Sequence, residues 1–252
     1  MSINFLEPLQ VLLFFLITFA IILIRYLVLA GGYHYALYSL FRHKIAHRIL
    51  DNKPLPPKQI RKEIYWSTLS AFIFSIFGVG IYTLWYYGYT AIYSTIDAYP
   101  LWYFFVSIFL ALFIQDTYYY WLHRWMHSPK VYRRLHKVHH NSVHTSAFTS
   151  FSFHPSETIA QALIFPPLIL LLPLHIYALL IMLGLMTLSA LINHAGVEVF
   201  PSGRLGRWMS KWIIGATHHD QHHRKFTANF GLYFTFWDRW MGTEIEVNPK
   251  EK

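Results

Sequence analysis

Histidine is frequent in this sequence, with 16 among 252 residues, and many of the histidines fall at short, repeated spacings. His123 and His127 lie four residues apart. An HxxHH pattern follows at His136, His139 and His140 and recurs at His219, His222 and His223, while His194 stands alone. Because residues three and four apart share a helix face, we expect each group to direct its imidazoles toward one point.

These nine histidines are too many for one metal ion. A tetrahedral zinc ion takes about four ligands, whereas two ions with about four or five nitrogen ligands each would use the whole set. Nitrogen ligands suit zinc, copper, iron and nickel, so the histidines alone leave the metal open. The chain contains no cysteine, which excludes thiolate ligands and iron–sulfur clusters.

The composition is that of a membrane protein. Hydrophobic residues make up 55% of the chain, aromatic residues 19% and charged residues 13%, which is about half the charged share of a soluble domain. Tyr and Trp are typical of membrane interfaces. The net charge of +9 is typical both of nucleic-acid-binding proteins and of membrane proteins with a basic cytoplasmic face. The positions of Lys and Arg decide between these two interpretations.

Apolar stretches alternate with polar segments along the chain. The apolar stretches cover residues 8–24 with a greasy continuation to Phe41, residues 66–87, residues 101–121, and residues 158–196, which contain no charged side chain. Pro166, Pro167 and Pro173 interrupt the last stretch, and we read it as a hairpin of two short helices. The expected fold is an all-α integral membrane protein with about four to five transmembrane or hairpin helices.

Lys and Arg are confined to particular segments. The connector 42–62 contains seven of them, and none occurs between Glu63 and His123 or between Lys137 and Arg204. With the connector in the cytoplasm, every Lys and Arg falls at or inside the cytoplasmic face, as the positive-inside rule requires. The histidine groups and His194 emerge at the same face, so we expect a cytosolic histidine-rich cap and no nucleic-acid partner.

The motifs resemble those of the fatty acid hydroxylase and sterol desaturase superfamily of membrane di-iron enzymes. The resemblance covers roughly Asp116 to Thr243. It rests on the stretches His123–His127, His136–His140 and His219–His223, together with His154-Pro155-Ser156-Glu157, Asn193-His194 and Phe236-Trp237-Asp238-Arg239. It implies a membrane part in residues 1–115 and a hydroxylase-like domain in residues 116–252, which includes the hairpin 158–196.

The resemblance also implies chemistry. Two iron ions, with zinc possible in isolated protein, would use O2 and two electrons to hydroxylate or desaturate a C–H bond of a lipid that enters from the bilayer. The electron donor would be a b-type cytochrome, a ferredoxin or an NAD(P)H reductase. The membrane would be a bacterial inner membrane or the endoplasmic reticulum. Sterols, fatty acyl chains and related lipids all remain open as substrates, as does the choice between hydroxylation and desaturation.

The expected metal ligands are the nine histidines above plus one more. His154 matches a family position and is our candidate for the tenth ligand, with His144, His218 and Glu198 as alternatives. Metal-bound imidazoles need a partner on their other nitrogen. Asp116 lies seven residues before His123, on the same helix face, and it is the main candidate for such a partner. Glu157 and Asp238 are further candidates.

Three other classes compete with an enzyme. A histidine-rich metal transporter or metal-binding protein would carry its ligands near the middle of the spans, where this sequence has few. A haem carrier would need single histidines that face each other across helices. A structural membrane protein with a chance histidine-rich loop would not repeat the HxxHH spacing. His34, His43, His47 and His175 fall outside the groups, and we expect them to be dispensable.

Overall fold

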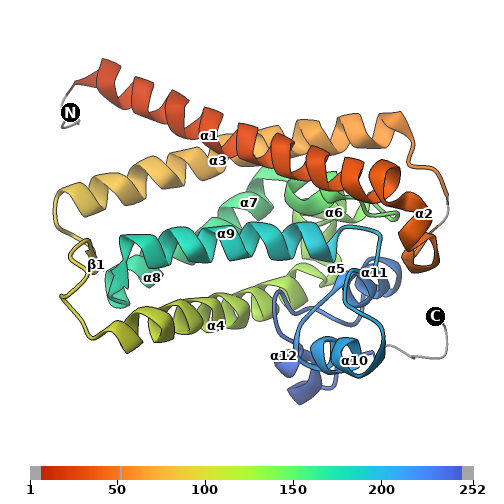
Figure 1. Ribbon diagram of the computed structural model, residues 1–252. Coiled ribbons are helices and arrows are strands. Elements are labelled where there is room, and N and C mark those ends of the chain that lie inside the picture. Colours follow the sequence, from red (N-terminus) through yellow and green to blue (C-terminus); the bar gives the residue numbers. More distant parts are fainter. Residues whose placement is uncertain (1–6, 52, 246–252) are drawn as a thin grey trace.

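The computed structural model describes residues 7–51 and 53–245 and is built around four long helices that run side by side (Figure 1). These are α1 (Pro8–Tyr35), α3 (Pro57–Tyr86), α4 (Leu101–Met126) and α9 (Ile176–Asn193). All four are long and apolar enough to cross a membrane, and a π-helical turn, Ala36–Leu40, extends α1. The prediction of an all-α membrane protein is therefore confirmed.

Short helices gather at one end of this bundle and form a cap (Figure 1). They are α2 (Arg42–Ile45), the 3-10 turn η2 (Ala46–Arg48), α5 (Pro129–Leu135), α6 (Lys137–His140), α10 (Gly203–Trp212), α11 (Ala216–Lys225) and α12 (Phe236–Trp240). At the opposite end, β1 (Ile92–Tyr93) pairs in parallel with β2 (Leu174–His175). The described parts of the connector, residues 42–51 and 53–62, therefore lie at the same end as the histidine-bearing elements.

Several boundaries differ from the expected ones, and proline explains two of the differences. The second long helix begins at Pro57 rather than near Trp66, because proline is well suited to the first position of a helix. The hairpin has three helices instead of two: α7 (Pro155–Ala162), α8 (Phe165–Leu171) and α9. Pro166 and Pro167 lie in the first turn of α8, where they start a new helix rather than break one.

Two hydrophobic clusters hold the bundle together. One joins α4, α8 and α9 through Ala111, Leu168 and Met182. The other joins α1 and α9 to the 3-10 helix η3 (Ala147–Phe151) through residues such as Tyr26 and Leu191. Burial of such side chains contributes about 1.5–3 kcal/mol each. The second cluster reaches the cap-side end of α9, which carries His194, whereas the first packs the middle of α4 and α9 and the end next to β2.

Candidate metal centre

The structure gathers nine histidines at the cap end of the bundle, in two groups. The five-histidine group contains His123, His127, His136, His140 and His222. The four-histidine group contains His139, His194, His219 and His223. Within each group every histidine offers one ring nitrogen, Nδ1 or Nε2, and these nitrogens all lie within 4.8 Å of one another. Each group therefore has the size and composition of a metal site built only from imidazole.

The two HxxHH motifs are each divided between the groups, which differs from the expectation that each motif points at one place. His136 and His140 belong to the five-histidine group, and His139 between them belongs to the other. In α11 the division is reversed: His222 joins the five-histidine group, and its neighbours in the motif join the four-histidine group. Helix geometry explains the division, because each residue turns the direction by about 100°. Positions i and i+4 are thus about 40° apart, whereas adjacent positions diverge.

Backbone carbonyls accept hydrogen bonds from the outer nitrogens of several of these rings. Nδ1 of His123 donates to the carbonyl of Phe230 at 2.8 Å, and that of His222 donates to Ala228 at 2.7 Å. In the four-histidine group, Nδ1 of His139 and His194 pair with the carbonyls of Ser152 and Ala190 at 3.4 and 2.8 Å. A carbonyl only accepts, so in these four rings Nδ1 carries the proton and Nε2 carries the lone pair.

This assignment tests whether a cation fits the centre. Nε2 of His139 and Nε2 of His194 lie 3.2 Å apart, and both carry lone pairs because both Nδ1 atoms donate to carbonyls. Two facing lone pairs cannot form a hydrogen bond with each other. A metal ion is the natural partner for neutral imidazole nitrogens placed in this way. The residues therefore fit a metal in both donor set and tautomer.

Burial also keeps the imidazoles in their ligand form. It lowers the pKa of His194 and of His222 to about 4, although a carbonyl hydrogen bond acts in the opposite direction on each. Burial, together with the nearby His222, lowers the pKa of His127 to about 2. Only neutral imidazole binds metal, so the site is set to bind cations at any ordinary pH.

Glu157 contacts a candidate ligand directly. Its Oε1 lies 2.8 Å from Nδ1 of His136, and both side chains are fully buried. Oε1 also accepts a bond from Gln161 at 3.1 Å. Burial raises the pKa of Glu157 well above its usual range and lowers that of His136. A cation on the histidine would act against this rise and favour the carboxylate.

Asp116 and Asp238 bind the loop 230–234, and this loop in turn contacts His123. Asp116 Oδ1 accepts the backbone N–H groups of residues 232, 233 and 234, at 3.2, 2.6 and 3.2 Å. Asp238 accepts those of Phe230 and Gly231, at 2.8 Å each. The expectation that Asp116 touches a histidine is wrong, because its oxygen faces this loop. The loop in turn presents the Phe230 carbonyl to His123.

Sequence reasoning missed Glu63, which holds the segment that follows the second histidine motif. This carboxylate is 1% exposed. It accepts bonds of 2.7–2.9 Å from the side chains of Gln59, Ser142, Ser146 and Thr149. In the sequence Glu63 sits at the end of a basic connector and looks like a solvated charge. The run of Ser and Thr in 142–150 is the signal that could have indicated a buried acceptor.

The candidates for a tenth ligand lie outside both groups. His154 caps α7, where its Nδ1 contacts the Ser156 hydroxyl at 2.5 Å and its ring packs near Trp66. His144 pairs with Asp51 at 2.6 Å. His218 lies 3.7 Å from Glu244. Glu198 accepts from the backbone of Phe200 and from Thr217. Each of these four side chains is therefore engaged in a helix N-cap, an ion pair or a hydrogen bond outside the two histidine groups.

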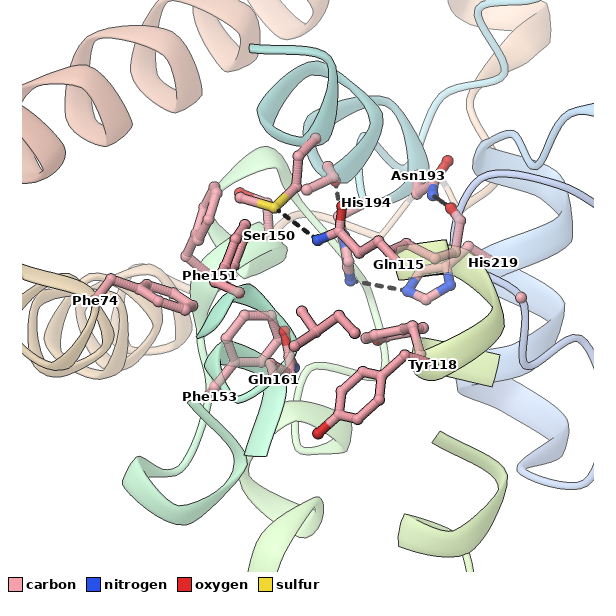
Figure 2. Close-up of a pocket in the computed structure, with 17 residues that line it drawn as sticks. Phe74, Gln115, Tyr118, Ser150, Phe151, Phe153, Gln161, Asn193, His194 and His219 are labelled. Atoms are coloured by element: carbon pink, nitrogen blue, oxygen red, sulfur yellow. Dashed lines mark hydrogen bonds between the residues drawn. The ribbon is translucent and has the colours of Figure 1, made fainter. Parts of the chain in front are cut away.

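An apolar cavity leads to the centre from between the membrane helices (Figure 2). A water-sized probe can reach about 50 Å³ of it, which is well below the range of about 300–1,000 Å³ usual for ligand pockets, so the cavity is narrow. Phe74 and Phe151 line one part, and His194 and His219 line another. The cavity therefore connects the bundle interior to the histidines.

The fold and the centre together define a class, a helical membrane protein whose cap gathers two all-histidine groups beside an apolar cavity. The model of the fatty acid hydroxylase family matches residues 108–243, and the chain belongs to this family. No solved structure gives a significant match.

Curated relatives of the chain are enzymes named for sterols. It is 32% identical to human lathosterol oxidase over 195 residues, which are 77% of this chain and 64% of the relative. It is 30% identical to a Delta(7)-sterol 5(6)-desaturase of Gibberella zeae over 238 residues, 93% of this chain and 63% of that protein. A methylsterol monooxygenase of Aspergillus fumigatus is 37% identical over 151 residues, 58% of this chain and 49% of that enzyme. The chain thus spans less than two thirds of the length of these relatives.

Proposed function

We propose that the protein is a membrane di-iron oxygenase that uses O2 and two electrons to oxidise a C–H bond of a lipid of the sterol class. The observation that carries the proposal is the pair of all-histidine groups at the end of an apolar cavity. The names of the relatives support a sterol substrate. Membership of the fatty acid hydroxylase family supports the reaction type.

Iron is favoured over other metals by the chemistry required. Zinc has no redox activity, whereas oxidation of an unactivated C–H bond needs a redox metal. Two irons held by the nine histidines would supply the activation of O2, which no side chain can perform. An external donor, such as a b-type cytochrome, a ferredoxin or an NAD(P)H reductase, would deliver the two electrons. In hydroxylation one oxygen atom enters the lipid and the other leaves as water. In desaturation the lipid loses two hydrogens and both oxygen atoms leave as water.

The residues of the chain have defined tasks in this scheme. The histidines hold the metals, and the carbonyls of Ser152 and Ala190 fix the tautomers of two of them. Glu157 keeps His136 oriented. The cavity wall, with Phe151 and Phe153, excludes water from the lipid carbon that reacts. Part of its lining, including Phe74, Tyr118 and Met186, comes from the membrane helices α3, α4 and α9, which favours a substrate that enters from the bilayer.

The histidine end of the bundle is proposed to face the cytoplasm. The connector 42–62, α5, α10 and α11 carry most of the Lys and Arg, and Figure 1 places these elements at the cap end. Such residues accumulate on the cytoplasmic side. The centre lies at this end of α4 and α9, away from their middle, which argues against a transporter with ligands at the bilayer midplane.

Metal analysis combined with lipid analysis tests the function. The wild-type protein should contain about two irons per chain. A host that expresses it should contain a sterol-class lipid that has gained one oxygen or lost two hydrogens. His219→Ala should abolish the product. His43→Ala is the matched control, because His43 is exposed on α2. Bound iron with no new lipid would favour a metal-binding protein without oxygenase activity.

A further inference from the structure

The cavity reaches one of the two histidine groups directly. Its wall includes His194 and His219, and both belong to the four-histidine group. Figure 2 shows the two rings side by side at the cavity, with their Nε2 atoms 2.8 Å apart. Phe153, also in the wall, packs against His139 of the same group with ring centroids 5.1 Å apart. The four-histidine group is thus the face of the centre that the cavity meets.

Aromatic rings of the cap surround the five-histidine group. Phe226 packs on His140 with centroids 4.7 Å apart, and Phe230 packs on His127 at 5.3 Å. Tyr132 lies 5.8 Å from His140 on another side. On the cavity side, Tyr119 lines the cavity and packs on His123 of this group with ring centroids 5.0 Å apart, and Gln161 in the wall bonds Glu157, which bonds His136. A molecule in the cavity therefore meets Tyr119 or the Gln161–Glu157 pair before it meets this group.

The number of histidines in each group also favours the four-histidine group as the one that a molecule in the cavity reaches. Iron in proteins commonly has up to about six ligands, and reactive sites leave positions open for substrates. Four imidazoles leave more open positions than five. The group with fewer ligands is the group that faces the cavity, so the open positions and the access coincide.

We propose that the two metal positions are not equivalent. The four-histidine group holds the ion that the lipid substrate and oxygen reach, and His194 and His219 form its boundary with the cavity. The five-histidine group holds an ion that Tyr119 and the Gln161–Glu157 pair separate from the cavity. This inference rests on the proposed di-metal function and assigns different tasks to its two halves.

Nitric oxide, a small probe that binds ferrous iron at open positions, tests the assignment without turnover. The protein is loaded with Fe(II) without air, its iron is counted by mass spectrometry, and the iron–nitrosyl signal is recorded by electron paramagnetic resonance. His219→Ala removes a ligand and weakens iron binding in the four-histidine group, and His140→Ala does the same in the five-histidine group. We expect His140→Ala to keep the signal within about twofold and His219→Ala to reduce it by roughly tenfold or more. The reverse order, or equal losses, would overturn the inference.

A second pair of variants keeps every ligand, in case either histidine variant loses both irons. Met186 lines the cavity, whereas its neighbour Leu185 is 41% exposed on α9. Met186→Trp should change the shape or intensity of the nitrosyl signal, and Leu185→Trp should leave it as in the wild type. An unchanged signal in both variants would contradict access through this cavity. A wild-type protein that binds no iron would instead refute the proposed function itself.

Discussion

Replacement of Glu157 by glutamine tests how the chain tunes a metal ligand. The carboxylate lies 2.8 Å from Nδ1 of His136, and neither side chain is exposed to solvent. A hydrogen bond to a charged partner contributes about 1.5–3 kcal/mol, and about 1.4 kcal/mol corresponds to a tenfold change in binding. Complete loss of the interaction should therefore weaken metal binding by roughly 10–150-fold. Glutamine keeps an acceptor oxygen but loses the charge, so we expect about tenfold, at the lower end of the range for such partners.

Competition with a chelator measures this effect. Purified wild type, Glu157→Gln and Glu157→Ala are equilibrated with increasing chelator, and the retained metal is counted by mass spectrometry. Glu157→Ala leaves a buried N–H without an acceptor and should show the larger loss. Asp97→Asn makes the same chemical change as Glu157→Gln in an exposed loop at the far end of the bundle and should match the wild type. If both Glu157 variants retain metal like Asp97→Asn, His136 does not depend on this carboxylate.

Three further outcomes follow from the centre. Asp116→Asn should lower lipid oxidation by roughly 10–100-fold at matched expression, because it weakens the anchor of the loop 230–234; activity equal to wild type would rule out this anchoring role. His154→Ala should leave the number of bound metals unchanged in elemental analysis, since His154 caps α7 outside both groups. Burial lowers the pKa of His194 and His222 to about 4, below the usual value of about 6.5. Their neutral, metal-binding form therefore persists as pH falls, so protein dialysed at pH 5.5 should keep its metal, and release should occur nearer pH 4.

The histidine spacing was sufficient to predict which residues meet, but not how they divide. The repeat at residues 136–140 and 219–223 indicates ligands at sequence level. The direction of each ring depends on how α6 and α11 are rotated about their axes, and tertiary packing sets that rotation. Sequence reasoning could therefore count the imidazoles but could not assign His139 and His222 to opposite groups.

The partners of the histidines were harder to predict than the histidines. Backbone carbonyls such as those of Ser152 and Phe230 exist at every position, so no residue type marks them. Among the carboxylates, Glu157 lies beside the candidate ligand His136, whereas Asp116 faces a loop that comes close only in the folded chain. The long helices were predictable because an apolar run of this length has few alternatives to a membrane span. The ends of these helices were harder to predict, because helices such as α3 continue into the cap beyond the apolar run.

The division of each HxxHH motif between the two histidine groups has a consequence for how the metal centre assembles. His139 and His140 are adjacent and serve different groups, as do His222 and His223. Consecutive α-carbons are about 3.8 Å apart in any trans chain, so the separation of the two groups is set twice by covalent geometry rather than by packing alone. A displacement of α6 or α11 must therefore disturb both groups together. Occupation of one group would order both helices and so prepare the other, and the chain should fill its two positions cooperatively.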